Sequence, residues 1–319
     1  LQVVAGQDGF VHMWDLATGT RSGGFRTTAP VAVSVKRDRA GQPNVVLAGI
    51  DGFLRSFGGG AVRWQFNARD AFGAVTISAT EVAAASRSRG QIRRFQLVDG
   101  AELDTPVGKA QDKLRIAAYA PDGRRLAVGN ETGAVAVYDM SGAAPRKTGR
   151  LTPGKGEVIA LRWSADGDVL AAAFAGGGLL AYVTQGKKTR AITYQRSGDS
   201  PSPALALIED TLIAGSRSGA VRSWGWADAS SHGAPSEHGA ATGWAVSGNG
   251  RVAAVADSVG RVSVGRFRTG GLGALSVFVS TDAWLGWTVD GNYVANAAGT
   301  TYLRIRVGRE LRPVSTFPG

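Results

Sequence analysis

Short apolar runs separated by glycine-containing turns follow one another along the whole chain. Typical runs are residues 45–48, 82–85 and 169–173, which are rich in valine and alanine. Apolar runs of this length, bounded by turn residues, predict β-strands. No stretch shows helical periodicity over three turns, so the sequence predicts an all-β protein.

The glycine turns recur at a regular interval, which predicts a repeat. Successive reference glycines are 38 to 44 residues apart, and the mean spacing is about 41. Four-stranded propeller blades have repeats of about 40–45 residues. The reference glycines are Gly9, Gly52, Gly90, Gly133, Gly177, Gly219, Gly260 and, less regularly, Gly299. The predicted repeats of this single domain lie near residues 1–28, 29–70, 71–108, 109–152, 153–196, 197–240, 241–280 and 281–319.

Two columns of the repeat indicate how its sheets pack. Two residues after each reference glycine, the first seven repeats carry only apolar residues, namely Val11, Leu54, Ile92, Val135, Leu179, Val221 and Val262. Five residues after it they carry Trp14, Phe57, Phe95, Tyr138, Tyr182, Trp224 and Gly265. Offsets two and five differ in parity, so the two columns point to opposite faces of a strand. Both faces are therefore predicted to be buried, as in a sheet stacked between two like sheets.

The sequence thus predicts a β-propeller of four-stranded antiparallel blades. Its innermost strands are predicted at 31–35, 75–78, 116–119, 158–163, 204–208, 244–246 and 284–288. The first repeat has no innermost strand of its own. We expect eight blades, with seven as the alternative if residues 284–288 complete the first repeat.

Two propeller families resemble parts of the chain. Residues 3–19, with the dipeptide Trp14-Asp15, are similar to the second half of a WD40 repeat, and Tyr138-Asp139 occupies the same place in the fourth repeat. The Gly-His dipeptide of strong WD40 repeats is absent, so these repeats are degenerate. Residues 47–53 and 62–64 are similar to repeats of quinoprotein-like propellers. Quinoprotein dehydrogenases would need a calcium site and often a vicinal cysteine pair, and this sequence has no cysteine and no acid cluster.

The composition argues against catalysis. The absence of cysteine excludes disulfides, thiolate catalysis and cysteine-bound metals. The three histidines are His12 in a predicted strand and His232 and His238 in a Ser/Gly/Pro-rich loop, and their spacing matches no compact metal site. No G-x-S-x-G elbow occurs. We therefore predict no catalytic residue, no cofactor and no metal site.

Charge is the remaining signal, because Lys+Arg 36 against Asp+Glu 25 gives a net charge of +11. In a propeller, the turns between second and third strands share one face with the connections between blades. This predicts a basic rim for partner binding that contains Arg87, Arg89, Lys113, Lys155 and Arg217. A further group of cations, including Arg124, Arg125, Lys147, Lys187 and Lys188, is predicted on the opposite face. Arg55, Arg93 and Arg222 share a repeat column, and we predict that they pack between blades.

We therefore expect a non-catalytic scaffold that binds acidic protein partners through loops on one face, as a subunit or domain of a larger assembly. The alternatives are a ligand-binding or enzymatic propeller with a site in the central channel, and a protein that binds nucleic acid or another polyanion. No transmembrane segment is predicted, since the best candidate, residues 170–183, is shorter than about 20 residues and contains three glycines. We expect a cytoplasmic location, with a secreted or periplasmic one left open because the chain begins at Leu1 and a signal peptide or domain could precede it.

Overall fold

The computed structural model consists almost entirely of β-strands. Among the described residues, its helical content is one short 3₁₀ segment, η1 (Ala110–Asp112). The described residues are 2–5, 10–15, 20–28, 30–38, 40–58, 61–185, 188–194, 201–216, 220–227, 229–230, 236–237, 241–246, 253–257, 261–265, 267–268, 271–272, 275–279, 284–287, 293–295, 304–307 and 310–313.

Within these described ranges, five sheets each contain four strands, and in each sheet consecutive strands of the chain pair side by side and antiparallel. The second sheet is formed by β4 (Pro30–Arg37), β5 (Pro43–Gly49), β6 (Phe53–Gly58) and β7 (Ala61–Asn67). The third is formed by β8 (Phe72–Ile77), β9 (Glu81–Ser86), β10 (Ile92–Gln96) and β11 (Glu102–Val107). The fourth is formed by β12 (Leu114–Tyr119), β13 (Arg125–Asn130), β14 (Val135–Asp139) and β15 (Arg146–Leu151). The fifth is formed by β16 (Val158–Trp163), β17 (Val169–Phe174), β18 (Leu179–Gln185) and β19 (Lys188–Tyr194). The sixth is formed by β20 (Pro201–Ile208), β21 (Thr211–Ser216), β22 (Ala220–Gly225) and β23 (Ser236–Glu237).

Two further sheets complete the described part of the ring. The first sheet has three strands, β1 (Gln2–Ala5), β2 (Phe10–Asp15) and β3 (Thr20–Arg26). The seventh sheet has the order β24 (Ala241–Val246), β25 (Ala253–Asp257), β26 (Arg261–Gly265), β29 (Leu275–Val279), β30 (Trp284–Trp287) and β31 (Tyr293–Ala295). Separate two-stranded sheets are formed by β27 (Phe267–Arg268) with β28 (Gly271–Leu272), and by β32 (Arg304–Val307) with β33 (Glu310–Pro313).

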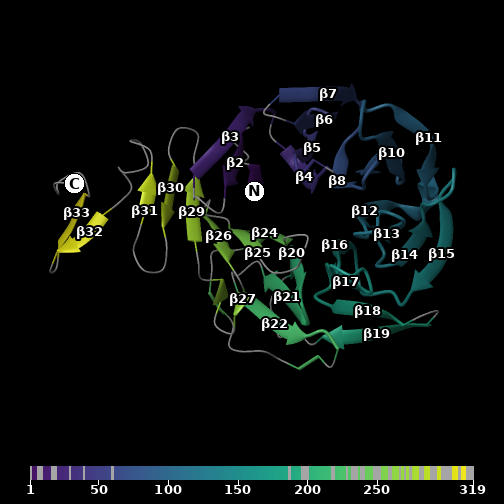
Figure 1. Ribbon diagram of the computed structural model, residues 1–319. Helices are drawn as coiled ribbons and strands as arrows, with labels where there is room; N and C mark the ends of the chain where they lie inside the picture. The colour runs from purple at the N-terminus through teal and green to yellow at the C-terminus, as the bar shows by residue number, and fades with distance from the viewer. Residues whose placement is uncertain are drawn as a thin grey trace.

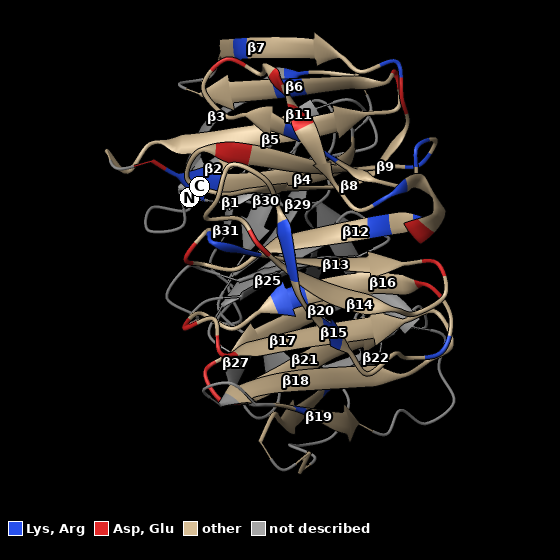
Figure 2. Cartoon of the chain, turned by 90° about the vertical axis from the view of Figure 1, so that its right-hand side faces the viewer, with Lys and Arg blue, Asp and Glu red and all other residues tan. Residues whose placement is uncertain are grey.

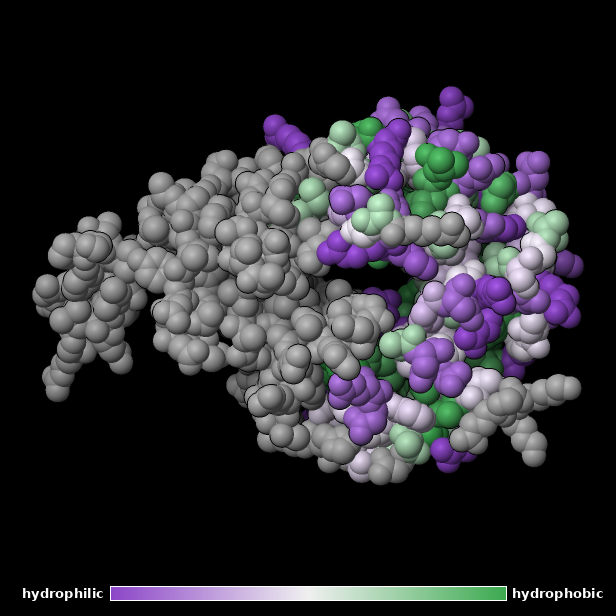
Figure 3. All heavy atoms as spheres, in the orientation of Figure 1, coloured by the Kyte–Doolittle hydropathy of each residue, from purple (hydrophilic) through white to green (hydrophobic). Residues whose placement is uncertain are grey.

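The sheets stand around a common axis. The first strands of neighbouring sheets, β4, β8, β12, β16, β20 and β24, contact one another in chain order. Figure 1 looks down this axis and shows the strands arranged around a central hollow, and Figure 3 shows the same hollow with side chains as spheres. This arrangement is a β-propeller, and it confirms the predicted fold class.

One predicted innermost strand lies elsewhere. Residues 284–288 were expected beside the ring axis, but β30 pairs with β29 and β31 and so extends the seventh sheet beyond its fourth strand. This pairing corrects the expectation, and it also differs from the alternative in which the same residues complete the first sheet. The number of blades stays a prediction.

The core lies between neighbouring sheets, as the two sequence columns predicted. The apolar column is fully buried where its side chains are described, with an exposed fraction of 0% at Leu54, Ile92 and Val135. The aromatic column is buried as well, from 0% at Phe95 to 8% at Tyr138. Each strand therefore contributes to two apolar layers, one on either face. The side chains of Trp14, Val221 and Val262 lie outside the described residues.

Aspartates hold several of the turns. Partial burial raises the pKa of Asp51, but hydrogen bonds from Arg55, Thr28 and the Phe53 N–H outweigh burial and lower this pKa from 3.8 to about 2. Hydrogen bonds from Ser141 and Arg146 lower the pKa of Asp139, which follows the fourth sheet's aromatic, to about 2 as well. Both carboxylates are therefore stabilised in the charged form by the folded chain.

We expect the protein to lose stability in acid between about pH 4 and pH 2. A carboxyl whose pKa is lower in the folded chain contributes its full stabilisation above the unfolded-state value of 3.8 and loses it as the pH falls through about 2. Urea unfolding at several pH values would measure this slope. The slope should be smaller in Asp51→Asn, and an unchanged slope would contradict the role given to Asp51.

Candidate interaction rim

One edge of the ring gathers two kinds of loop. In an antiparallel meander, alternate turns lie at opposite ends of the strands, so the second-to-third-strand turns share an edge with the connections between sheets. Backbone hydrogen bonds tie these loops together around the edge: Leu114 N–H donates to Gly90 O at 2.8 Å, Gly154 N–H to Gly133 O at 3.1 Å and Gly176 N–H to Lys155 O at 3.0 Å. We call this edge, seen from the side in Figure 2, the rim.

The rim carries four of the five predicted partner-binding residues. Arg87 and Arg89 lie in the β9–β10 turn, Lys113 follows η1, and Lys155 lies between β15 and β16; all four are exposed. Arg217 lies outside the described residues. The four described residues therefore lie on the same edge of the ring. Their role in partner binding stays a prediction.

Lys113 differs from the other three because it forms an ion pair with a carboxylate. Its Nζ lies 2.5 Å from Oε1 of Glu131, and Arg115 contacts the other oxygen of the same carboxylate at 2.9 Å. Hydrogen bonds from Lys113 and Arg115 lower the pKa of Glu131, so it stays ionised. Lys113 therefore adds less to the field of the rim than the sequence alone indicated.

Arg87 lies toward the central channel. A Cβ placed on Gly73, in the innermost strand β8, would come within 3.1 Å of the Arg87 Nε. Arg115, on the innermost strand β12, donates from Nη1 to the Arg87 carbonyl at 2.9 Å. The lack of a side chain at Gly73 thus leaves room for the Arg87 guanidinium beside the channel mouth.

Sequence reasoning missed at least two exposed rim cations, Arg69 and Lys109, of which Lys109 lies in the β11–β12 connection. Arg69 lies in the connection between β7 and β8, is exposed, and has a φ of 47°. It stands three residues before β8, as Lys155 stands three residues before β16. Lys155 was predicted on the rim because it lies in a connection between sheets, and the same reasoning applies to Arg69.

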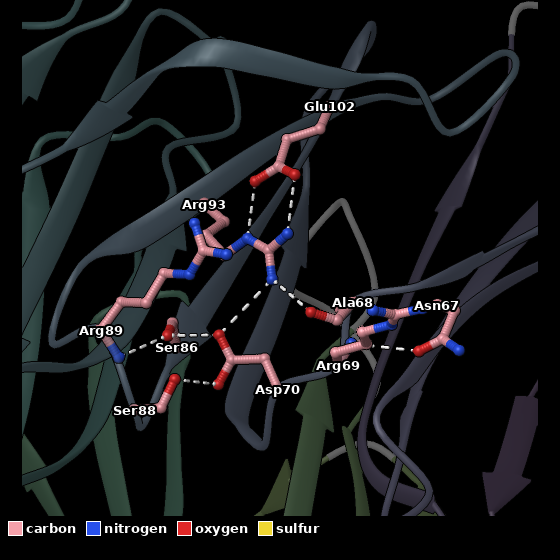
Figure 4. A network of polar contacts seen from close by, with 9 residues as sticks. All are labelled: Asn67, Ala68, Arg69, Asp70, Ser86, Ser88, Arg89, Arg93 and Glu102. Carbon is pink, nitrogen blue, oxygen red and sulfur yellow. Dashed lines mark hydrogen bonds and ion pairs between the residues drawn. The ribbon is translucent and has the colours of Figure 1, made fainter.

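A buried polar network holds the β9–β10 turn. Asp70 accepts hydrogen bonds from Ser86 Oγ at 2.5 Å and Ser88 Oγ at 2.8 Å, and the Arg89 N–H donates to Ser86 Oγ at 2.9 Å (Figure 4). Burial raises the pKa of Asp70, but the hydrogen bonds from the two serines and the Arg93 charge outweigh it, so the pKa is lowered. The turn that presents Arg87 and Arg89 is thus anchored to the connection between the second and third sheets.

Arg93 completes this network from β10. Its Nη1 lies 3.4 Å from Asp70 Oδ2 and donates to the Ala68 carbonyl at 3.0 Å, while Nε and Nη2 each lie 2.6 Å from a Glu102 oxygen. The guanidinium also lies 5.4 Å from the Phe95 ring centre. Arg93 is 3% exposed, so it packs between sheets, as its repeat column predicted.

A small polar depression lies beside the network. It has a volume of about 360 Å³ and is lined mainly by Arg89 and Gln91 of the rim turn and by Glu102 and Asp104 of β11. It contains no serine, cysteine or histidine that could serve as a nucleophile or base. In the described part of the chain, no cluster of three or more histidine, cysteine or acidic residues could hold a metal ion.

The opposite edge of the ring carries many acidic residues. Its turns contain many acids, namely Asp99, Asp122, Asp139, Asp166, Asp168, Glu209 and Asp210 (Figure 2). Two of its arginines are engaged, because Arg125 pairs with Asp122 and Arg146 with Asp139. Lys187 and the side chain of Lys188 lie outside the described residues. The opposite edge therefore carries charges of both signs, with Arg124 and Lys147 exposed there.

Comparisons with solved structures agree with the propeller. The β-propeller domain of Cps50 (Swd1) from Myceliophteria thermophila has a TM-score of 0.67 at 14% identity, covering 79% of this chain and 88% of that chain. The computationally designed protein Ika8 has a TM-score of 0.66 at 17% identity, covering 92% of each chain. BamB from Moraxella catarrhalis has a TM-score of 0.56 at 18% identity, also covering 92% of each chain.

These neighbours represent the two families that the sequence resembles, since Swd1 is a WD40 propeller and BamB a quinoprotein-like one. At such identities the likeness shows the fold alone. No family model matches the sequence, and no curated protein matches it. In the described part of the chain, no helix is long and apolar enough to cross a membrane.

Proposed function

We propose that this protein is a non-catalytic interaction propeller that binds an acidic protein partner through the rim. The observation that carries the proposal is the exposed set Arg69, Arg87, Arg89 and Lys155, none of which forms an ion pair within the described residues. Cations that form no ion pair in the described part of the chain are available to an external carboxylate.

The rim suits recognition of carboxylates. A guanidinium can donate two parallel hydrogen bonds to one carboxylate, which adds geometric specificity to the charge attraction. Because Asp70 and its serine donors hold the β9–β10 turn, little ordering of the backbone is needed when a partner binds. Net positive charge also speeds the encounter with an acidic surface.

The test is a tagged pull-down of the full chain from its native source, washed at low and at high salt and analysed by mass spectrometry. We expect an acidic protein near one-to-one stoichiometry with the wild type. The double variant Arg87→Glu/Arg89→Glu should recover about tenfold less of it or lower, because like charges across an interface repel.

The matched control reverses two exposed cations on the opposite edge. Arg124→Glu/Lys147→Glu makes the same change in net charge, so a partner that depends on the rim should be recovered at the wild-type level. Equal loss in both doubles would show that only net charge matters, and no loss in the rim double would reject the rim as the binding face.

Nucleic acid is the second candidate, favoured by the same rim cations and by the net charge of +11. It predicts that affinity for duplex DNA falls steeply with salt, with a log–log slope of about −0.9 per phosphate neutralised. A flat salt dependence, together with a partner that survives the high-salt wash, would favour the protein partner.

A further inference from the structure

The outermost strand of the third sheet bulges beside the rim. Ile92 of β10 lies opposite Val107 of β11, and Arg94 lies opposite Leu103. The β11 residues 104–106 therefore stand against one residue of β10, Arg93. A bulge of this kind interrupts the ladder of hydrogen bonds and redirects side chains. The small polar depression described above lies at this point of the sheet.

A buried arginine holds the bulge in place. Arg94 is 3% exposed, and its Nη1 donates to the Thr105 carbonyl at 3.0 Å and to Thr105 Oγ1 at 2.6 Å. Its Nη2 lies 2.6 Å from Oε1 of Glu81 on β9, which fixes the guanidinium. Thr105 is thereby held at Arg94, while Asp104 and Pro106 line the depression. The opening in β11 is therefore built into the fold of the third sheet.

The depression has a mixed charge that distinguishes it from the exposed cations of the rim. It is lined by the ion pair of Arg93 with Glu102, and the same guanidinium also contacts the buried Asp70. Two carboxylates thus share one cation. Asp104 adds a carboxylate and Arg89 adds a cation, and both are exposed and form no ion pair within the described residues. Carboxylates therefore outnumber cations at this point of a basic edge.

The two charges without an ion pair stand beside the same buried guanidinium. Arg89 lies in the β9–β10 turn, and Figure 4 shows its side chain extending toward Arg93. Asp104 lies in the part of β11 that stands opposite Arg93. The volume of about 360 Å³ is near the lower end of the range for ligand sites. It can hold one long side chain.

We infer that the depression receives a cationic side chain of the partner protein, an arginine or a lysine. The charge of this side chain meets Asp104 and Glu102, while a neighbouring carboxylate of the same partner meets Arg89. The inference rests on the proposed function, because it places the depression within the contact surface of the rim. The partner's acids pair with the exposed rim arginines, and one of its bases enters the depression.

This arrangement lets the rim discriminate between partners. The phosphates of nucleic acid carry only negative charge, so a phosphate that approaches Arg89 is repelled by Asp104. A protein can present an acid and a base side by side and so satisfy both charges of the depression. Asp104 is therefore a specificity-determining residue, because it favours a mixed-charge protein surface over a polyanion.

The first test is a calorimetric titration of the full chain with N-acetyl-L-arginine, which carries one guanidinium and one carboxylate. We expect saturable binding with a Kd of about 1 mM, and about fivefold weaker binding by Asp104→Asn, because one charge contact is lost. N-acetyl-L-citrulline, which lacks the positive charge, should bind the wild type about fivefold more weakly than N-acetyl-L-arginine does. Absence of saturable binding, or equal binding by Asp104→Asn, would overturn the inference.

The matched control for this titration is Asp168→Asn. Asp168 is an exposed acid on the opposite edge of the ring, and its replacement makes the same change in net charge. This variant should bind N-acetyl-L-arginine with the affinity of the wild type. An equal weakening in Asp104→Asn and Asp168→Asn would show that only net charge matters, which would also overturn the inference.

The second test repeats the pull-down with both variants. Recovery of the partner should fall about fivefold in Asp104→Asn and stay at the wild-type level in Asp168→Asn. Full recovery by Asp104→Asn, together with loss in Arg87→Glu/Arg89→Glu, would overturn this inference and leave the proposed function intact. Stronger retention of a salt-sensitive nucleic acid by Asp104→Asn, with no protein partner, would overturn both. If the wild type recovers no partner, the proposed function fails and the titration decides whether the depression binds a cationic side chain.

Discussion

Replacing Asp70 with alanine is expected to lower the free energy of unfolding by about 3 kcal/mol. The Asp70 side chain is 1% exposed and that of its partner Arg93 is 4% exposed, so the change leaves a buried guanidinium without one of its two carboxylates. Ser86 and Ser88 lose their acceptor as well. The loss stays near the lower end of the range for broken buried pairs because Glu102 still contacts Arg93.

Chemical denaturation would measure this loss, and a second variant would locate its cause. Glu102 is 32% exposed, so Glu102→Ala should cost only about 1 kcal/mol. In the Arg93→Met background, Asp70→Ala should cost clearly less than in the wild type, since no charge is then stranded. Equal costs in both backgrounds would show that the two side chains are not coupled.

The Asp70 variant should also affect the rim. The β9–β10 turn loses the anchor that links it to the preceding sheet, so Arg87 and Arg89 are held less firmly. We expect faster amide exchange at residues 87–90 in Asp70→Ala than in Glu102→Ala. Unchanged exchange would mean that the turn is held by its backbone bonds alone, such as Arg87 N–H to Ala71 O at 2.8 Å.

Replacing Phe95 with alanine is the second change with a large expected effect, a loss of about 3–5 kcal/mol in the free energy of unfolding. Phe95 is fully buried and its ring centre lies 5.1 Å from that of Phe66 and 6.4 Å from that of Phe72. Because these neighbours come from β7 and β8, which belong to two different sheets, the cavity cannot close by a small movement of one strand.

The control for this prediction lies three residues away. Val98 is 78% exposed, so Val98→Ala should change the free energy of unfolding by less than about 0.5 kcal/mol. Thermal and urea unfolding of both variants would measure the difference. A loss below about 1 kcal/mol in Phe95→Ala would contradict the view that the aromatic column holds neighbouring sheets together.

The fold was predictable because its signals are local and repeated. Offsets two and five after each glycine place Leu54 and Phe57 on opposite faces of β6, and both are buried as expected. The same repeat placed the turns that carry Arg87 and the connections that carry Lys155 on one edge. Because the pattern recurs in seven repeats, an exception at one position, such as Gly265 in the aromatic column, did not hide it.

The candidate site was predictable only in outline. Membership of the rim follows from the order of strands, but pairing does not, because Lys113 and Glu131 stand on different loops whose approach depends on the packing of the fourth sheet. The Asp70 network was missed for the same reason. Its members come from the connection before β8, the end of β9 and the following turn, and no spacing in the sequence marks them as neighbours.

By itself the sequence determined the repeat, the all-β class, the two buried faces of each sheet and the edge on which the rim loops lie. The buried faces follow from alternation within a strand, and the rim follows from the order of strands in each repeat. Only the tertiary structure decided which rim cations form no ion pair among the described residues, and that residues 284–287 join the seventh sheet. These features depend on contacts between segments that are far apart in the chain, and the free energy of such contacts cannot be derived from the local sequence pattern.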